Sequence, residues 1–361
     1  MQKRAKILLN LLVIIGIFIL GIASTILIID KYPSLFRETI TKLEKDVTVT
    51  ETGIADAVEK VYDSVIVVST LSKNQVIGSG SGFIYKVNSN DTYIITNHHV
   101  VDGGDSFKVT YTDTDALTAT LVGSDEYSDI AILKVTTKEN YKAVEIGNSD
   151  IMRVGDTTFT IGAPLGDIYS WTVTRGILSG KERLVEVSLS NSRQSDYIMN
   201  VLQTDSPVNS GNSGGPISNS NGEVIGVVNA KISSTGVEGI GFAIPIEVAI
   251  EKAEEIINGK ESSKPYLGIS MLNVEDAKYY MNYRNYISSN ITSGVIVIDI
   301  ENDSIADNNL KIGDVITEIN NKSVKNVAYL RYELYKYKSG ETIKIKIIRD
   351  NNEKEISIKL S

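Results

Sequence analysis

A serine surrounded by glycines is the most chemically suggestive feature of the sequence. Ser213 lies in Asn209–Pro216, which reads Asn-Ser-Gly-Asn-Ser-Gly-Gly-Pro. A nucleophilic serine needs a tight turn that exposes its Oγ and points backbone N–H groups at a developing oxyanion. Glycine permits such a turn because it tolerates positive φ and close backbone approach. A loop of a β protein can have the same composition, so this motif alone leaves both interpretations open.

Two adjacent histidines, His98 and His99, are the only ones in the chain. They follow the apolar run Tyr93–Thr96, which predicts a strand ending just before them. An activated serine needs a neighbouring base such as imidazole, and only this pair can supply one. A structural histidine is the alternative. The chain has no cysteine, so disulfides and thiolate metal sites are excluded, and we expect no metal and no cofactor.

A single carboxylate, Asp129, stands directly before the apolar run Ile130–Val135. At the start of a buried strand its side chain would lie beside hydrophobic residues. Such an aspartate can hold a histidine in one tautomer and stabilise the imidazolium that forms during proton transfer. Taken alone, it could equally be an ordinary turn residue.

Taken together, these motifs occur in the order His, Asp, Ser, which is the order in chymotrypsin. With several further segments they resemble the HtrA family of trypsin-like serine proteases. The fourth position of the family motif Thr-Asn-x-His-Val selects His99, and we assign no role to His98. The segments that carry the resemblance are Thr96–Val100, Ser128–Ala131, Ile161–Gly166, Thr172–Ile177, Gly211–Gly215 and Gly239–Pro245.

The last part of the chain resembles a PDZ domain. Tyr266, Leu267, Gly268 and Ile269 match the carboxylate-binding loop of such domains, and Leu310–Ile316 matches their central turn and strand. Successive N–H groups of the loop would hold a terminal carboxylate, while Leu267 and Ile269 would line a socket for the last side chain. We expect the strand at 294–300 and the helix at 325–337 to supply the other walls. The alternative is that the four residues simply begin a core strand.

The resemblance implies a trypsin-like pair of six-stranded β-barrels with the site between them, followed by the PDZ domain. His99, Asp129 and Ser213 would form the triad, and the backbone N–H groups of Gly211 and Ser213 the oxyanion hole. Family members usually cut unfolded or misfolded proteins without ATP, often as homotrimers, and their PDZ domains bind C-termini or hydrophobic segments. The alternative function is a catalytically silent, membrane-tethered peptide-binding module.

Hydrophobic patterning independently favours a mainly β fold, because short apolar or alternating runs recur between Gly, Asn, Asp and Ser. A helix is expected after Pro245, with Val248, Ala249, Ala253, Ile256 and Ile257 on one face and a stop at Gly259. Further predicted strands are 64–70, 107–111, 119–122, 172–178 and 224–228 in the first domain, and 315–319, 343–349 and 356–360 in the second.

The N-terminal region reads as a membrane anchor. Ile7–Ile29 is an apolar run of the length that crosses a bilayer, and Lys3, Arg4 and Lys6 precede it. The positive charges predict a cytoplasmic N-terminus, a single span in the cell membrane, and protease and PDZ domains outside. A cleaved signal peptide and a buried soluble helix are the alternatives. A net charge of −9 argues against a nucleic-acid partner.

The predicted organisation therefore has five parts. They are a cytoplasmic N-terminus at 1–6, a transmembrane signal anchor at 7–29, a linker at 30–54, a protease domain at 55–260 and a PDZ domain at 265–361.

Overall fold

The computed structural model describes residues 13, 15–25, 31, 54–112, 115–137, 141–163, 169–188, 195–232, 239–260 and 264–360. The chain divides into two compact units, Met1–Gly53 and Ile54–Ser361. In the first unit, residues 15–25 are helical. Among the described residues, no helix combines the length and the apolar character needed to cross a membrane. The predictions for 1–6, for 7–12, 14 and 26–29 of the anchor, and for most of 30–54 lie outside the described residues.

The first barrel opens the second unit. Within the described residues it closes in the strand order β1-β2-β3-β6-β5-β4, with every pairing antiparallel. β-Branched runs such as Val65–Val68 favour these strands because they pack well on a pleated surface. The helices and strands are α3 (Ala55–Tyr62), β1 (Val65–Ser72), β2 (Gln75–Asn88), β3 (Asp91–Thr96), α4 (His98–Val101), β4 (Ser106–Thr110), β5 (Leu117–Asp125) and β6 (Ile130–Thr136).

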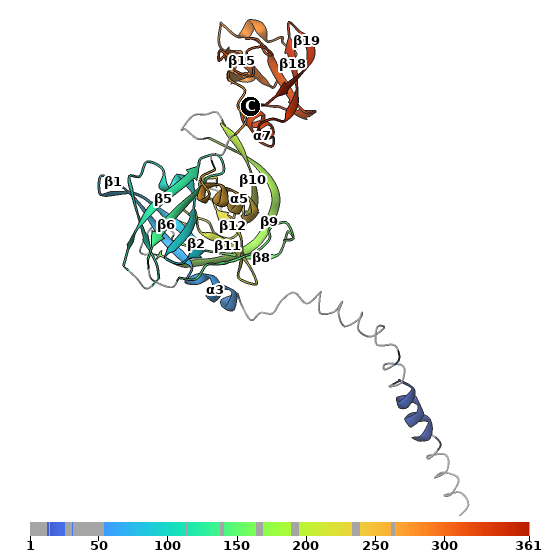
Figure 1. The fold of residues 1–361 in the computed structure, drawn as a ribbon. Helices are drawn as coiled ribbons and strands as arrows, with labels where there is room; N and C mark the ends of the chain where they lie inside the picture. Colours follow the sequence, from blue (N-terminus) through green and yellow to red (C-terminus); the bar gives the residue numbers. More distant parts are fainter. Residues whose placement is uncertain are drawn as a thin grey trace, which may run out of the picture. The chain divides into compact units, whose positions relative to one another are not determined.

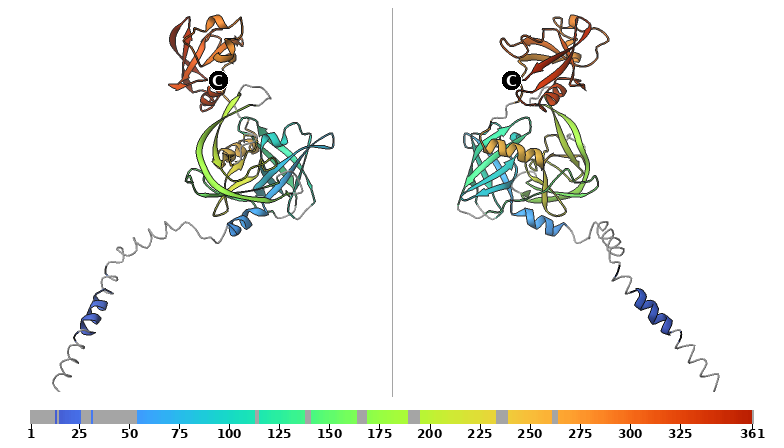
Figure 2. Two further views of the ribbon diagram at one scale, coloured as in Figure 1. Left: turned by 180° about the vertical axis from the view of Figure 1, so that it is seen from behind. Right: turned by 45° about the vertical axis from the view of Figure 1, so that its right-hand side comes forward.

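The second barrel follows in the sheet order β11-β8-β9-β10-β13-β12-β7, as far as the described residues show. Pairing of β11 with β12 closes six of these strands into a ring, and β7 adds to β12 in parallel. The trypsin-like arrangement expected from the sequence is confirmed, and Figure 2 shows the two barrels as neighbouring groups in both views. The strands are β7 (Glu145–Ile146), β8 (Thr157–Gly162), β9 (Thr172–Val187), β10 (Tyr197–Thr204), β11 (Pro216–Asn219), β12 (Glu223–Val228) and β13 (Gly241–Pro245).

Helix α5 (Ile246–Ile257) begins directly after Pro245, as predicted, and packs against strands of both barrels (Figure 1). Its buried residues are Ile246, Ala249 and Ala253. The prediction that Val248 shares this face is wrong, because its side chain is 41% exposed. One residue along a helix rotates the side chain by about 100°, which turns Val248 away from the buried Ala249.

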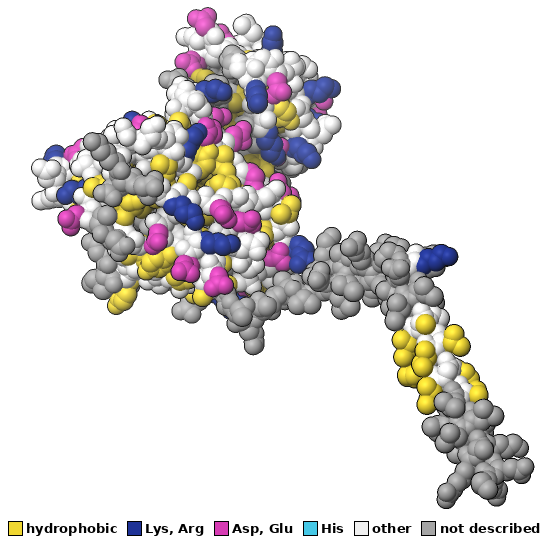
Figure 3. Space-filling view, turned by 60° about the horizontal axis from the view of Figure 1, so that its bottom comes forward, with side chains coloured by type: hydrophobic (Ala, Val, Ile, Leu, Met, Phe, Trp, Pro, Cys, Tyr) yellow, Lys and Arg dark blue, Asp and Glu magenta, His cyan; other side chains and the backbone are white. Residues whose placement is uncertain are grey.

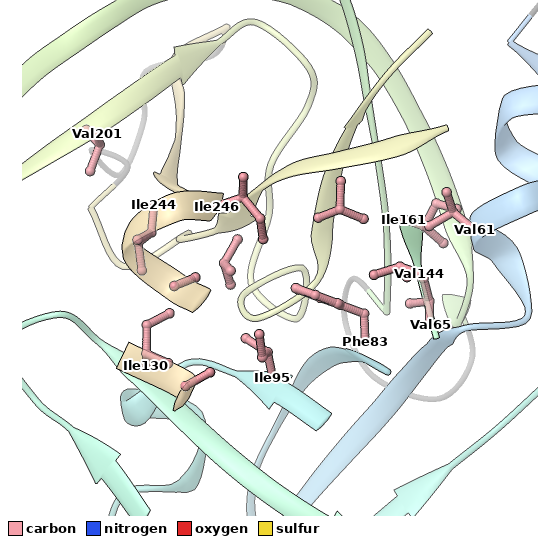
Figure 4. Packing of buried hydrophobic residues seen from close by; sticks show 14 of the residues in the cluster. Val61, Val65, Phe83, Ile95, Ile130, Val144, Ile161, Val201, Ile244 and Ile246 are labelled. Atoms are coloured by element: carbon pink, nitrogen blue, oxygen red, sulfur yellow. The ribbon is translucent and has the colours of Figure 1, made fainter. Parts of the chain in front are cut away.

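A hydrophobic core is shared by the two barrels. Phe83 and Ile130 come from the first barrel, and Ile161, Val201 and Ile244 come from the second. Figure 4 shows these side chains gathered between the strands of the two barrels. Neither barrel buries the apolar side chains of this core by itself, so the position of one barrel depends on packing against the other.

The C-terminal domain has a separate hydrophobic core, confirming the PDZ prediction in its mainly β character. Its sheet order is β14-β15-β16-β18-β19, with β17 on β16, in a stretch described without a gap from 264 to 360. Helix α7 begins where the Asn326 side chain accepts a hydrogen bond from the N–H of Tyr329. The elements are β14 (Ile269–Asn273), α6 (Val274–Ala277), η2 (Arg284–Tyr286), β15 (Val295–Ile300), β16 (Val315–Ile319), β17 (Lys322–Ser323), α7 (Val327–Leu334), β18 (Thr342–Arg349) and β19 (Asn352–Lys359).

Charged side chains on the face shown in Figure 3 are mixed in sign. Lysine and arginine lie among aspartate and glutamate, and no large area of one sign forms there. This distribution agrees with a chain that carries 36 basic and 45 acidic residues.

The shared core generates a stability prediction. Phe83→Ala removes a fully buried ring from it, so we expect the free energy of unfolding to fall by about 3–5 kcal/mol. Val76→Ala, at a side chain that is 65% exposed, is the control and should change the value by less than about 0.5 kcal/mol. Urea denaturation followed by tryptophan fluorescence measures both, and equal losses would contradict the shared core.

Candidate active site

His99 and Asp129 come together because the strands that precede and follow them are paired. Thr96 at the end of β3 lies opposite Ala131 in β6. The backbone N–H of His99 donates to Asp129 Oδ1 at 2.9 Å, and His99 Nδ1 lies 2.6 Å from Asp129 Oδ2. Asp129 adopts a left-handed φ of +53°, which a short polar side chain tolerates better than most residues. The pair is a buried carboxylate fixed against one edge of an imidazole.

Further donors surround Asp129, whose exposure is 2%. Asn229 Nδ2 donates to Asp129 Oδ2 at 2.8 Å, and Asn97 Nδ2 donates to the Asp129 backbone carbonyl at 2.8 Å. A buried carboxylate must be compensated by bonds such as that from Asn229, because removal from water is costly. Burial, and then the negative charge of Asp129, raises the pKa of Tyr197.

His98 lies outside this cluster. Its Nδ1 is 2.9 Å from Ser124 Oγ, and its backbone N–H donates to the Asp129 carbonyl at 3.2 Å. The structure thus places the ring of His99, and not that of His98, on the Asp129 carboxylate.

Ser213 lies in the turn between β10 and β11 and is 5% exposed. Its Oγ accepts a hydrogen bond from the backbone N–H of Ala230 at 3.1 Å. Within the described part of the chain, no hydrogen bond joins Ser213 to His99. Gly214 has a φ of +84°, and a Cβ there would overlap the Ser81 carbonyl oxygen. This turn therefore requires glycine after the serine.

The backbone N–H groups of Gly211 and Ser213 have no hydrogen-bond acceptor among the residues that the structure describes. Neighbouring groups of the same loop are bonded: the Asn212 N–H donates to the Asn209 carbonyl at 3.0 Å, and the Gly214 N–H donates to the Val228 carbonyl at 2.9 Å. Two unused donors in a buried loop can bind an oxyanion.

The predicted PDZ loop begins with an exposed Tyr266 and a buried Leu267. The carbonyl of Leu267 accepts from the Ala306 N–H at 3.0 Å, and that of Gly268 from the Glu301 N–H at 2.9 Å. Gly268 has a φ of +77°, and a Cβ there would overlap the Ser304 side chain. The carbonyls of Leu267 and Gly268 therefore accept hydrogen bonds from within the domain.

A cavity of about 170 Å³ adjoins this loop. Helix α7 forms one wall, as expected. The prediction that the strand at 294–300 forms the other is wrong, because β14 does so and β15 contributes no lining residue. The lining residues are Tyr127, Pro265, Tyr266, Leu267, Gly268, Ile269, Met271, Leu330, Arg331, Leu334 and Tyr335.

Sequence reasoning missed Asn229. It directly follows the apolar strand β12, the same kind of signal that drew attention to the histidines after β3. It also missed Tyr127, whose contribution to the cavity depends on contacts between residues distant in the sequence.

Comparison with known proteins identifies both domains. Residues 80–227 match the model of the trypsin-like peptidase domain, and residues 265–360 match that of the PDZ domain. Serine protease Do-like HtrB of Bacillus subtilis is 36% identical over 327 residues, which cover 86% of this chain and 71% of that protein. The chain belongs to the HtrA family of serine proteases.

Other HtrA relatives are similar. Serine protease Do-like HtrA of Bacillus subtilis is 40% identical over 296 residues, covering 81% of this chain and 65% of that protein. An HtrA-like protease of Staphylococcus haemolyticus is 34% identical, and the match spans 51% of its length. The crystal structure of the serine endoprotease from Yersinia pestis has a TM-score of 0.64 and 28% identity, covering 87% of this chain and 99% of that one.

The Asn229–Asp129 contact predicts the effect of a second carboxyl in this HtrA site. Asn229→Asp would place it beside Asp129, where the two cannot both ionise readily. We expect the free energy of unfolding to fall by about 1–3 kcal/mol at pH 7. Like-charge contact raises the folded-state pKa of one carboxyl, so the deficit should shrink as the pH falls towards 4.

Urea denaturation at several pH values measures this effect. Asn200→Asp, which adds one carboxylate at an exposed position of β10, is the matched control. A deficit that does not depend on pH, or one shared by the control, would rule out repulsion between the two carboxyls.

Proposed function

We propose that the protein is a serine endopeptidase in which Ser213 is the nucleophile, His99 the general base and Asp129 the residue that orients His99. The observation that carries this proposal is the buried Asp129 carboxylate bonded to Nδ1 of His99. That bond leaves Nε2 of the same ring available to accept a proton. The family relationship supports the proposal.

In the proposed reaction, His99 Nε2 takes the proton of Ser213 Oγ as the oxygen attacks the carbonyl carbon of the substrate. The negative charge on the carbonyl oxygen is stabilised by the N–H groups of Gly211 and Ser213, each contributing about 2.7–4 kcal/mol. The imidazolium then gives its proton to the leaving amine. Water, deprotonated by the same imidazole, releases the acyl group and restores the serine.

One observation favours the alternative, a catalytically silent peptide-binding module. Ser213 Oγ is bonded to the Ala230 N–H instead of to His99. For catalysis, the serine side chain must leave Ala230 and turn to His99 by rotation about its Cα–Cβ bond, which moves between staggered wells. A measurement of Ser213 reactivity therefore separates the two functions.

We propose unfolded or misfolded proteins as substrates and hydrolysis without ATP, on the strength of the family resemblance. The PDZ domain would bind the C-termini or hydrophobic segments of such chains. The cavity between the 266–269 loop, β14 and α7 supports this role, because its lining is largely apolar and suits a hydrophobic side chain.

We also propose that residues 7–29 anchor the protein in the cell membrane as a single span, with the N-terminus in the cytoplasm and both domains outside. The apolar run and the basic residues before it support this topology. Assembly as a homotrimer is proposed from the family resemblance.

The triad generates a prediction for activity. Ser213→Ala and, separately, His99→Ala should lower the rate of casein cleavage by at least about 10³-fold, because each removes a group that the reaction needs. His98→Ala is the matched control, since this ring bonds Ser124 instead of Asp129, and should keep most of the activity. Gel analysis of casein fragments measures all three.

A serine-directed phosphonate adds an independent readout. Mass spectrometry should find it on Ser213 of the wild-type chain and not on the Ser213→Ala variant. Absence of labelling in a folded wild-type chain would favour the silent module, and a larger loss in His98→Ala than in His99→Ala would reverse the choice of base.

The PDZ loop generates a binding prediction. In the Ser213→Ala chain, peptides that end in an apolar residue with a free carboxylate should bind at least about tenfold more tightly than their amidated forms, because amidation removes the charge that the loop would hold. Calorimetry measures both. Gly268→Ala, which would crowd Ser304, should weaken only the free-carboxylate peptides, and equal affinity for both forms would exclude carboxylate capture.

A further inference from the structure

Ser81 of β2 is fully buried against residues 209–215, which include the proposed nucleophile Ser213 and are called the nucleophile loop below. It stands between Gly80 and Gly82, and a Cβ on Gly80 would lie 3.1 Å from the Ser213 carbonyl oxygen. The absence of side chains beside Ser81 lets β2 approach the loop closely enough for direct bonding.

Two hydrogen bonds of Ser81 reach the carbonyls of the two residues whose N–H groups face the proposed oxyanion. The Ser81 N–H donates to the Ser213 carbonyl at 2.8 Å. The Ser81 hydroxyl donates to the Gly211 carbonyl at 2.7 Å. One residue of the first barrel therefore fixes both carbonyls of the loop that carries the nucleophile.

These bonds restrain the orientation of the peptide planes. In the peptide unit between Gly211 and Asn212, the carbonyl accepts from the Ser81 hydroxyl and the N–H donates to the Asn209 carbonyl. In the unit between Ser213 and Gly214, the carbonyl accepts from the Ser81 N–H and the N–H donates to the Val228 carbonyl. Because peptide units are planar, the unit that carries the Ser213 N–H lies between two planes that cannot turn freely.

The direction of the Ser81 hydroxyl is itself fixed. Its Oγ accepts from the Ala163 N–H at 2.9 Å, so its own hydrogen is left for Gly211. The Ser81 carbonyl accepts from the Thr96 hydroxyl at 2.7 Å. Every polar group of Ser81 is thus bonded, and Ala163, directly after β8, ties the arrangement to the second barrel.

We infer that Ser81 is a positioning residue for the oxyanion hole. Its hydroxyl holds the Gly211 carbonyl and thereby keeps the N–H groups of Gly211 and Ser213 in place. This inference rests on the proposed protease function. Glycine at 211 has a φ of +100° and little intrinsic restraint, so the loop depends on an external bond to keep its shape.

Ser81→Ala tests the inference, with Ser64→Ala as the matched control. Ser64 is equally buried, and its hydroxyl donates to the carbonyl of Lys142 at 2.8 Å. Both variants lose one buried hydroxyl that donates to a backbone carbonyl, and Ser81→Ala also removes the acceptor of the Ala163 N–H. Only Ser81 contacts the nucleophile loop.

For Ser81→Ala we expect kcat for a peptide substrate to fall about tenfold or more, against the 10²–10³-fold loss that follows direct removal of an oxyanion donor. KM should stay unchanged, because substrate binding is not affected. The midpoint of the fall in kcat on the acid side of the pH–rate profile should also stay unchanged, because His99 is not affected. The affinity of a peptide boronate, whose tetrahedral adduct occupies the oxyanion hole, should fall by the same factor as kcat. Ser64→Ala should keep kcat within about twofold.

Ser81→Cys, which keeps the side-chain size and a weak donor, should lie between Ser81→Ala and the wild type, and it serves as the test if the alanine variant does not fold. Unchanged kcat and boronate affinity in Ser81→Ala, with unfolding affected as in Ser64→Ala, would overturn the inference. Absence of hydrolysis by the wild-type chain would instead overturn the proposed function, so the two failures are distinguishable.

Discussion

Burial of the Asp129 carboxylate is the constraint on which the proposed active site depends. Desolvation of a carboxylate is tolerated only when donors surround it. The donors come from distant parts of the chain: the backbone and ring of His99 follow β3, and the amide of Asn229 follows β12 of the second barrel. The two barrels must therefore meet at this point, and the proposed active site occupies the place where they do.

A second constraint is the close approach of β2 to the nucleophile loop. Gly80 and Gly214 leave no space for a side chain at their positions. Ser81 then bonds the loop from the first barrel while Ala163 bonds Ser81 from the second. The geometry of the loop is consequently a property of both barrels, although all its residues lie in one segment.

Local patterns predicted most of the strands and helix α5, since β-branched runs and helical periodicity depend on neighbouring residues. The family motif selected His99, whose ring lies on Asp129. Asn229, Ser81 and Tyr127 were not found, because each acts through contacts with residues far away in the sequence; only Asn229, directly after an apolar strand, carries a local signal. Val248 was misplaced because a count of apolar residues does not decide which edge of a helical face meets the core.

The core that both barrels share has a consequence for self-digestion. Phe83 and Ile130 on one side pack with Ile161, Val201 and Ile244 on the other, so separating the barrels would expose apolar surface from both at once. Partial opening of one barrel is thereby disfavoured. For the substrates proposed above, chains that lack stable structure, this means that the packing that joins the two barrels would also withhold the protein's own backbone from cleavage.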